Sequence, residues 1–487
     1  EISLGLVGSE MCIRDSSMSE EKYDLVVIGS GPGGYVASIV AAQKGMKVAS
    51  IEKRTTLGGT CLNVGCIPSK AMLHASEQYE NAVKLNGNKE WGITCKDVKL
   101  DLTKLLKKKS GIVDELTKGI DFLYKKNKVT KYIGTAKFIT ANSIEITGDN
   151  TRNLIHAENI IIATGSEATH LPNINIDEKK IVTSTGALEL KEVPKKMIVI
   201  GAGIIGLEMG TVWRRLGSDV EVIEYLPRIL PGMDNEVAEK FMKILEKQGL
   251  NFKLGQAVES SKIVENKVIL SIRNVTKENT YEIDADVVLV AVGRKPNTHG
   301  LGLKDLNIDI DKHGFIKTNN YFQTSINNIY AIGDVIKGPM LAHKAEEDGV
   351  AAVEIINGEA GHVDYNLVPG IIYTAPEVAV IGKTEEELKE EGIEFNKGVF
   401  PLSANSRAKA ISHTDGMVKI LSDKSTDKIL GAHMIGHEAG TVIHELSIAM
   451  GFGASSEDVA RICHGHPTVN EAVKEAALAT YSKAIHF

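Results

Sequence analysis

An apolar segment runs directly into a glycine-rich turn at Tyr23-Asp-Leu-Val-Val-Ile-Gly29-Ser-Gly31-Pro-Gly33-Gly34. A helix is expected over 35–44, followed by a second strand that ends at Glu52. In such a unit the first glycine makes a tight turn, the second lets the backbone approach a pyrophosphate, and the third lets helix and strand pack closely. The helix N-terminus offers unpaired N–H groups to the phosphates, and the carboxylate accepts hydrogen bonds from an adenosine ribose. The segment therefore predicts a dinucleotide site at Gly29, Gly31, Gly34 and Glu52.

The chain repeats this unit at Met197-Ile-Val-Ile-Gly201-Ala-Gly203-Ile-Ile-Gly206, and a later strand ends at Glu224, as far from the first glycine as Glu52 is in the first copy. A single GxGxxG is weak evidence, but two ordinary strand–helix turns would not explain the matched carboxylates. Two nucleotide sites imply two nucleotides, and electron transfer between them is the expected activity. Glu224 favours NAD, because a carboxylate suits a free 2′-hydroxyl and repels the 2′-phosphate of NADP.

Each unit closes with a buried-type strand that ends in small residues, at 159–166 and at 287–294. Small residues there would let a dinucleotide approach closely. A further strand, Asn328-Ile-Tyr-Ala-Ile-Gly333-Asp334, puts a carboxylate at its C-terminal end, where ligands bind in open α/β sheets. An aspartate in that place could instead cap a helix.

Two cysteines follow the first carboxylate closely, in Gly58-Gly-Thr-Cys61-Leu-Asn-Val-Gly-Cys66-Ile-Pro-Ser-Lys70. On a regular helix, residues five apart have Cα atoms about 8–9 Å apart, and a disulfide tolerates about 7 Å at most. If the two bond, the backbone must leave the helix between them, and Gly65 is suited to that. The alternatives are a passive disulfide or half of a zinc site, although no second pair of this kind supplies the remaining zinc ligands.

The C-terminal segment Cys463-His464-Gly465-His466-Pro467-Thr-Val-Asn-Glu471 offers a base for thiol chemistry. Thiol–disulfide exchange requires a thiolate, and a carboxylate on one ring nitrogen of a histidine raises the basicity of the other. His466 could instead cap a helix. The cysteine and the two histidines could also bind a metal, but His-Gly-His is poor geometry for a single ion, so no metal is predicted.

Length, charge and composition exclude several classes of protein. A chain of 487 residues should form two to four domains. A net charge of −7 provides no basic field for nucleic acid. The sequence contains no apolar run of about 18 residues, the length that a membrane-spanning helix needs. Five scattered cysteines indicate a reducing compartment rather than a secreted disulfide framework. Residues 1–17 lack an export or transit signal and are expected to be foreign to the fold, so the expected location is the cytoplasm, or the mitochondrial matrix if a presequence was lost.

Together these motifs resemble those of the pyridine nucleotide–disulfide oxidoreductases, and the cysteine segment is most similar to that of the dihydrolipoamide dehydrogenase branch. The similarity runs from Tyr23 to Phe487 and includes Ala331-Ile-Gly-Asp-Val, Met340-Leu-Ala-His-Lys-Ala-Glu346 and Ala404-Asn-Ser-Arg-Ala408. The resemblance implies an α/β fold with two Rossmann-like dinucleotide-binding domains, as in glutathione reductase, and an α+β dimerisation domain at the C-terminus.

The resemblance also implies domain boundaries and partners. We expect a disordered extension at 1–21, an FAD-binding domain at 22–166 and 293–363, an NAD-binding domain at 167–292, and a dimerisation domain at 364–487. The implied activity is oxidation of protein-bound dihydrolipoamide to lipoamide by NAD⁺, through a Cys61–Cys66 disulfide and FAD. The implied partners are a second copy of the chain, whose tail enters the active site, and the lipoyl domains of 2-oxoacid dehydrogenase complexes or the glycine-cleavage carrier protein.

Residue roles are carried over position by position. The implied catalytic residues are Cys61, Cys66, His466 and Glu471. The implied FAD-binding residues are Gly29, Gly31, Gly34, Glu52, Lys70, Gly134, Thr164, Gly165, Ser166, Asp334, Met340, Leu341, Ala342 and His343. The implied NAD-binding residues are Gly201, Gly203, Gly206, Glu208, Glu224, Val258 and Gly293. Within this set, Lys70 and Glu208 match an ion pair near the flavin ring.

Three other interpretations fit less well. Glutathione reductases favour NADP, which Glu224 opposes, and their motif lacks Ile67-Pro68-Ser69. Mercuric reductases are expected to end in a cysteine pair, whereas this chain ends Ala-Ile-His-Phe. A non-catalytic flavoprotein scaffold would need neither the cysteine pair nor the histidine–glutamate pair.

Overall fold

The first nucleotide unit lies in a seven-stranded sheet of the computed structural model, which describes residues 21–86 and 90–487. The expected extension at 1–21 lies almost wholly outside the described residues. The strand order is β3-β2-β1-β6-β5-β4, with β17 paired to β6. The strands are β1 (Glu21–Ile28), β2 (Val48–Glu52), β3 (Thr130–Ile133), β4 (Thr135–Thr140), β5 (Ser143–Thr147), β6 (Arg152–Ile162) and β17 (Ile329–Ala331).

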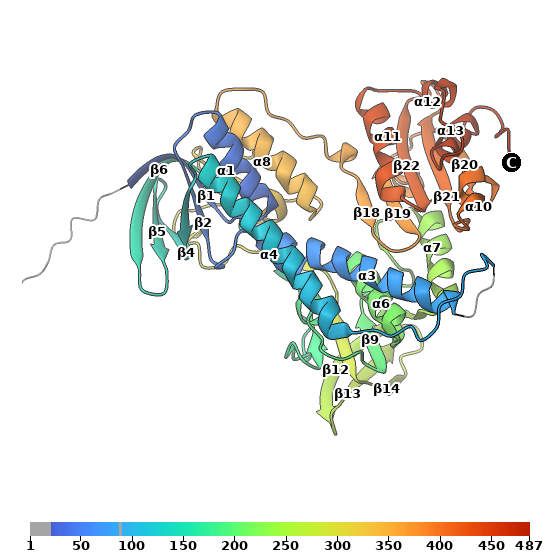
Figure 1. The fold of residues 1–487 in the computed structure, drawn as a ribbon. Helices are drawn as coiled ribbons and strands as arrows, with labels where there is room; N and C mark the ends of the chain where they lie inside the picture. The colour runs from blue at the N-terminus through green and yellow to red at the C-terminus, as the bar shows by residue number, and fades with distance from the viewer. Residues whose placement is uncertain (1–20, 87–89) are drawn as a thin grey trace, which may run out of the picture.

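Helices cover this first sheet. Strands β1, β2, β6 and β17 run parallel, and side chains in the middle of β1 are fully buried, as expected for parallel strands covered on both faces. Helices α1 (Pro32–Gln43) and α8 (Ala342–Ile356) lie side by side, and α4 (Leu102–Lys126) crosses beside them (Figure 1). The short helix α2 (Gly59–Val64) leads into the long helix α3 (Cys66–Leu85), which runs away from the first sheet (Figure 1).

The second nucleotide unit forms a five-stranded parallel sheet with the order β11-β10-β9-β15-β8. An antiparallel meander, β12-β13-β14, packs beside it, and an antiparallel ribbon of β7 and β16 connects the two units. The strands are β7 (Ser166–Ala168), β8 (Ile181–Val182), β9 (Lys196–Ile200), β10 (Asp219–Glu224), β11 (Asn251–Leu254), β12 (Gln256–Val264), β13 (Lys267–Asn274), β14 (Thr280–Ala285), β15 (Val287–Val290) and β16 (Arg294–Pro296). The helices are α5 (Ser184–Ala187), α6 (Ile204–Leu216) and α7 (Asn235–Lys247).

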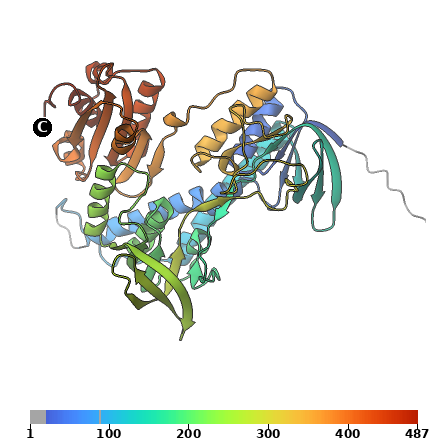
Figure 2. The same ribbon diagram turned by 180° about the vertical axis from the view of Figure 1, so that it is seen from behind.

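The C-terminal part is a third, antiparallel sheet with the order β18-β19-β22-β21-β20. Figures 1 and 2 show it standing apart from the first sheet and connected to it by an extended segment after α8. Its strands are β18 (Gly370–Ile372), β19 (Glu377–Gly382), β20 (Phe395–Pro401), β21 (Met417–Asp423) and β22 (Ile429–Gly436). Its helices are α9 (Glu385–Glu390), α10 (Ser406–Ala410), α11 (Ala439–Gly451), α12 (Ser456–Arg461) and α13 (Glu471–Leu478). The expected fold class is confirmed.

A buried lysine joins the second and third sheets. Lys419, on β21, has no exposed surface, and its ammonium donates to Asp234 at 2.9 and 3.0 Å and to Glu385 at 2.7 Å. Asp234 is also fully buried and caps the N-terminus of α7. Burial alone would lower the pKa of Lys419, but the hydrogen bonds that its ammonium donates to Glu385, Glu236 and Asp234 raise it. This cluster fixes α7 against the third sheet.

Replacing Lys419 with methionine should destabilise the protein strongly, because the Asp234 carboxylate would stay buried without its cation. The expected loss in the free energy of unfolding is about 3–5 kcal/mol, measured by urea titration. Lys397→Met is the matched control: Lys397 contacts the same acids, Glu236 and Glu385, at 3.5 and 3.3 Å, but from an exposed position. Its loss should stay below about 1 kcal/mol. Equal losses in the two variants would contradict a special role for the buried cluster.

Candidate active site

The two cysteines stand on either side of a break between two helices. Helix α2 ends at Val64, Gly65 adopts φ −131° and ψ −114°, and α3 begins at Cys66. A Cβ on Gly65 would lie 2.9 Å from the Thr60 carbonyl oxygen and 3.3 Å from the Cys61 Cα. The backbone therefore leaves the regular helix at the glycine, as the spacing of the cysteines requires. Both cysteines are free thiols, and their side chains hydrogen-bond to each other.

The environment separates the two thiols in acidity. The hydrogen bond with Cys66, burial and the nearby Glu346 carboxylate all raise the pKa of Cys61. The hydrogen bond from Cys61 and the positive charge of Lys70 lower the pKa of Cys66 to about 7, against the opposing effect of burial. In the reduced pair the negative charge therefore resides on Cys66, and Cys61 remains a neutral thiol.

The lysine beside Cys66 forms the ion pair that the resemblance implies. Lys70 Nζ, on α3, lies 2.9 Å from Glu208 Oε2, on α6, and the Glu208 side chain is almost fully buried. The other carboxylate oxygen of Glu208 accepts a hydrogen bond from the Tyr373 backbone N–H at 2.9 Å. The Lys70 ammonium also lies 4.6 Å from the centre of the Tyr373 ring. Sequence reasoning missed Tyr373, because nothing in its local sequence marks a contact so distant along the chain.

The two carboxylates of the nucleotide units make matching contacts. Glu52 accepts from the backbone N–H groups of Ser30 at 3.0 Å and Arg54 at 2.9 Å. Glu224 accepts from the equivalent N–H groups of Ala202 at 2.8 Å and Leu226 at 2.9 Å. Each acid therefore fixes its own glycine turn. In the first unit the Ser30 hydroxyl adds a third hydrogen bond to Glu52 at 2.6 Å, and the Gly134 N–H donates to the Glu52 carbonyl at 2.8 Å.

The glycines of the turns divide into two kinds. A Cβ on the first or third glycine would collide with backbone: Gly29 with the Ala163 carbonyl oxygen at 2.2 Å, and Gly34 with that of Gly29 at 1.9 Å. Gly201 and Gly206 meet carbonyl oxygens at 2.3 and 2.2 Å in the second unit. The second glycines instead face open space, since a Cβ on Gly31 would have one neighbour, at 3.9 Å, and one on Gly203 would have none within 4 Å. Crowded first and third glycines beside an open second one fit a dinucleotide pyrophosphate in each unit.

Asp334 lies at the junction of the first sheet and the ribbon. It stands in the 3₁₀ turn η1 (Gly333–Val335), and its carboxylate accepts a hydrogen bond from the Ser166 hydroxyl at 2.5 Å. Arg294 donates to the Ser166 hydroxyl at 2.7 Å and to its carbonyl at 2.6 Å. Beside the same ribbon, the Thr164 hydroxyl donates a hydrogen bond to the Asn297 carbonyl, and the Asn297 amide donates one to the Thr164 carbonyl. Arg294 was not predicted as a site residue, although it directly follows Gly293 in one of the closing strands.

The remaining expected cofactor residues lie on several different elements. Gly165 and Gly293 have positive φ of 71° and 110°, and a Cβ on either would face open space. Met340 and Leu341 precede α8, and Ala342 and His343 begin it, with His343 Nε2 2.7 Å from the Pro369 carbonyl oxygen. Val258 lies on β12, next to a shift in register with β13.

The histidine and glutamate of the tail are paired. His466 Nδ1 lies 2.9 Å from Glu471 Oε1, and the Thr468 N–H donates to Glu471 Oε2 at 2.9 Å. Burial would raise the pKa of Glu471, but these contacts lower it overall, so the carboxylate is held ionised against the ring. The His466 side chain is 68% exposed, which leaves its second ring nitrogen open to a partner. Within the described ranges, no group of three or more metal-ligating side chains is gathered here or elsewhere.

One chain does not bring this base to the thiols. His466 lies between α12 and α13, whereas Cys66 begins α3, and Figure 1 shows those helices on the third sheet, well away from the start of α3. A substrate bound at Cys61 would therefore need the base from another chain.

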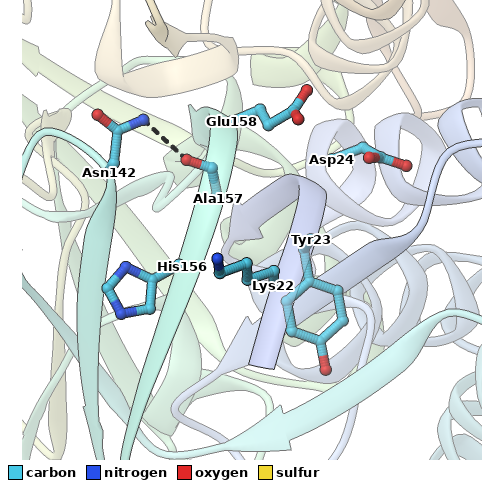
Figure 3. A pocket seen from close by; sticks show the side chains of 7 residues that line it. All are labelled: Lys22, Tyr23, Asp24, Asn142, His156, Ala157 and Glu158. Carbon is cyan, nitrogen blue, oxygen red and sulfur yellow. Dashed lines mark hydrogen bonds between the residues drawn. The ribbon is translucent and has the colours of Figure 1, made fainter. Parts of the chain in front are cut away.

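A hollow elsewhere on the surface contains none of the candidate residues. It has a volume of about 220 Å³ and lies where β1 begins beside β6 (Figure 3). The Asn142 amide donates to the Ala157 carbonyl there at 2.9 Å. The lining is mixed in charge and has no thiol, so it does not compete with the cysteine pair as a redox site. Among the residues that the structure describes, no helix is long and apolar enough to cross a membrane.

Comparisons with known proteins agree with this geometry. Residues 23–349 match the pyridine nucleotide-disulphide oxidoreductase family, and residues 368–477 match the dimerisation domain of that family. The chain is 53% identical to mitochondrial dihydrolipoyl dehydrogenase of Pisum sativum, over 97% of this chain and 94% of the relative. It is also 53% identical to the mitochondrial dihydrolipoyl dehydrogenase of Sus scrofa, over 100% of this chain and 96% of the relative.

Solved structures give the same result. The HOCl-induced flavoprotein disulfide reductase RclA from Escherichia coli is similar with a TM-score of 0.82 at 27% identity, over 93% of this chain and 99% of RclA. Two glycine turns with matched carboxylates, a thiol pair at a helix break, and the family matches lead to one conclusion: the chain belongs to the pyridine nucleotide-disulphide oxidoreductase family.

Proposed function

We propose that the chain is a dihydrolipoamide dehydrogenase, which oxidises dihydrolipoamide to lipoamide with NAD⁺. The observation that carries the proposal is the thiol pair at the α2–α3 break, with the pKa of Cys61 raised and that of Cys66 lowered beside Lys70. A pair divided in this way has one thiol suited to accept attack by a substrate and one suited to leave as a thiolate. The relatives named above carry out the same reaction by name.

FAD and NAD are the cofactors of the enzyme. The first glycine turn, Glu52, Ser166 and Asp334 would hold FAD, and the second turn with Glu224 would hold NAD. When bound, FAD accepts two electrons from the thiol pair and passes them to NAD⁺. Lys70, held by Glu208, keeps a positive charge beside Cys66.

The residues of the chain carry the exchange steps. His466 of one chain takes the proton from one thiol of dihydrolipoamide, and the resulting thiolate attacks the sulfur of Cys61 in the Cys61–Cys66 disulfide. The disulfide breaks, and Cys66 leaves as a thiolate stabilised by Lys70. Glu471 holds the His466 ring and stabilises the imidazolium that forms.

The second step releases the product. The remaining substrate thiol attacks the substrate sulfur bonded to Cys61, that bond breaks, and lipoamide leaves with a new disulfide. The proton of this thiol passes to Cys61, whose raised pKa suits the neutral thiol. Two electrons now reside on the cysteine pair, one proton on Cys61 and one on His466, so the exchange balances.

The working unit is a homodimer. The family match includes a dimerisation domain, and His466 stands exposed on that domain, away from the thiols of its own chain. We propose that each tail supplies His466 and Glu471 to the cysteine pair of the partner.

The enzyme associates with 2-oxoacid dehydrogenase complexes. Within that association we propose that lipoyl domains, or the glycine-cleavage carrier protein, present the dihydrolipoyl group. We propose the mitochondrial matrix rather than the cytoplasm as the location, and the relatives named above support this because they are mitochondrial by name.

We propose the expected division into domains because each proposed domain has a main sheet of its own. β17 joins the first sheet after the whole second sheet has been completed, which favours an FAD-binding domain of 22–166 and 293–363. The ribbon of β7 and β16 lies at both crossings into the inserted NAD-binding domain, 167–292. The third sheet supports a dimerisation domain at 364–487.

The function is tested by anaerobic titration of the oxidised holoenzyme with dihydrolipoamide. Two-electron reduction should produce a long-wavelength absorption band, because Cys66, whose pKa is lowered, would then be a thiolate that can donate charge to a bound flavin. The band should clear on addition of NAD⁺ and persist with NADP⁺, since Glu224 repels a 2′-phosphate. A yellow protein that responds to another dithiol but ignores dihydrolipoamide would overturn the substrate.

The acidity of Cys66 should move in opposite directions when the two charges of the ion pair are removed. Lys70→Met removes a cation, so the pKa of Cys66 should rise above about 7 and the thiolate fraction at neutral pH should fall. Glu208→Gln removes an anion that raises this pKa, so the pKa should fall. The measurement is the pH dependence of the long-wavelength band of the reduced enzyme. Shifts of the same sign in both variants would contradict the electrostatic account.

The proposed sharing of the base between chains is tested with two inactive variants. His466→Gln should lower dihydrolipoamide oxidation about 10²–10⁴-fold, as the loss of a general base does, and Cys66→Ser should abolish it. After the two variants are unfolded and refolded together, activity should return to roughly one quarter of that of the parent, because half of the dimers are mixed and each has one intact site of two. Refolding each variant alone is the control. A mixture that stays as inactive as the separate variants would show that the base acts within its own chain.

A further inference from the structure

A fully buried ion pair lies in helix α8, outside the residues predicted from the sequence. Lys344 and Asp348 each have no exposed side-chain surface, and their charged atoms lie 2.8 Å apart, one helical turn from each other. Replacing such a pair with apolar side chains is often neutral or stabilising, so stability alone does not account for it.

Both members of the pair hold the same backbone residue. The Gly333 N–H donates to Asp348 Oδ2 at 3.0 Å, and Lys344 Nζ donates to the Gly333 carbonyl oxygen at 3.0 Å. Gly333 has a φ of +71°, in the left-handed region that favours glycine. The cation and the anion thus fix both polar groups of one residue, a glycine whose backbone could otherwise adopt several conformations.

A tyrosine completes the cluster. The Tyr365 hydroxyl donates to Asp348 Oδ1 at 2.8 Å, and Lys344 Nζ lies 5.0 Å from the centre of the Tyr365 ring. Burial and the charge of Asp348 raise the pKa of Tyr365, so its hydroxyl remains a donor. Each carboxylate oxygen of Asp348 therefore has a partner, and the cluster has one arrangement rather than several.

The residue after Gly333 is Asp334, whose carboxylate accepts from Ser166 at the edge of the proposed flavin site. Rotation of the Gly333 peptide would turn Asp334 away from Ser166. We propose that Lys344 and Asp348 are positioning residues for the flavin: they fix the Gly333 backbone so that the Asp334 carboxylate is held toward FAD. This inference rests on the proposed role of Asp334.

The test is a double-mutant cycle on FAD affinity in the full-length protein. The variants are Asp348→Asn, Asp334→Asn and the combination, and FAD released from diluted holoenzyme is measured by its fluorescence. Asp348→Asn alone should weaken FAD binding about tenfold or more, as the loss of one partner of a hydrogen-bonded buried charge pair does. In the Asp334→Asn background it should cause little further loss, because the carboxylate that it positions is already gone. The visible spectrum of the bound flavin should shift in each single variant.

A control and the remaining outcomes decide the proposal. Lys44→Met removes the 2.6 Å pair with Glu359, which is more exposed and lies beside the far end of α8, and it should leave FAD affinity within about twofold. Additive losses from Asp348→Asn and Asp334→Asn, or a lower unfolding temperature with unchanged FAD affinity, would overturn the proposal. If Asp334→Asn alone leaves FAD affinity unchanged, the proposed role of Asp334 fails instead. Should Asp348→Asn not fold, Tyr365→Phe takes its place in the cycle, and additive losses there overturn the proposal equally.

Discussion

The architecture depends on a close backbone contact in each nucleotide unit, between the end of the first strand and the start of the helix that follows it. A helix can bring its free N–H groups to a pyrophosphate only if no side chain separates it from the strand. In the first unit the third glycine, Gly34, lies directly over the carbonyl of Gly29, and in the second unit Gly206 lies over that of Gly201. The close approach of the helix to the strand depends on this contact, and the second glycine is left facing open space.

The two thiols of the pair have different acidities because different charges lie near them, and this difference gives each a separate part in the exchange. Cys61 and Cys66 lie on either side of one helix break, yet the Glu346 carboxylate acts on the first and the Lys70 ammonium on the second. The break at Gly65 makes this possible, because it ends α2 and lets Cys66 begin a new helix that also carries Lys70. When a substrate thiolate attacks Cys61, the negative charge of the reduced pair is therefore held on Cys66.

The glycine turns with their carboxylates and the His466–Glu471 contact were predictable from the sequence, because each depends on residues close together in the chain. The fold class was expected from the resemblance of the motifs to a known family. The position of Asp334 after a strand was also predictable, since that strand is of a recognisable type. Tyr373 and the Lys344–Asp348 pair were not, because their roles come from contacts with Glu208 and Gly333 that only the folded chain creates. Arg294 stands at the end of the closing segment 287–294, but its role could be recognised only once the folded ribbon brought its side chain to Ser166. The sequence could relate His466 to Glu471, but the separation of this pair from the thiols is a property of the whole chain.

The carboxylate of Glu208 has a consequence for the history of such enzymes. Glu208 stands on α6, a helix that packs on the second sheet. Its carboxylate contacts Lys70 near the start of α3 and the backbone N–H of Tyr373, next to the third sheet. Three parts of the chain thus meet at one side chain that water barely reaches. A chimera with a distant relative would keep this contact only if the exchanged part supplies the matching lysine, glutamate or backbone N–H. The parts of such an enzyme are therefore constrained to diverge together, although each has a sheet of its own.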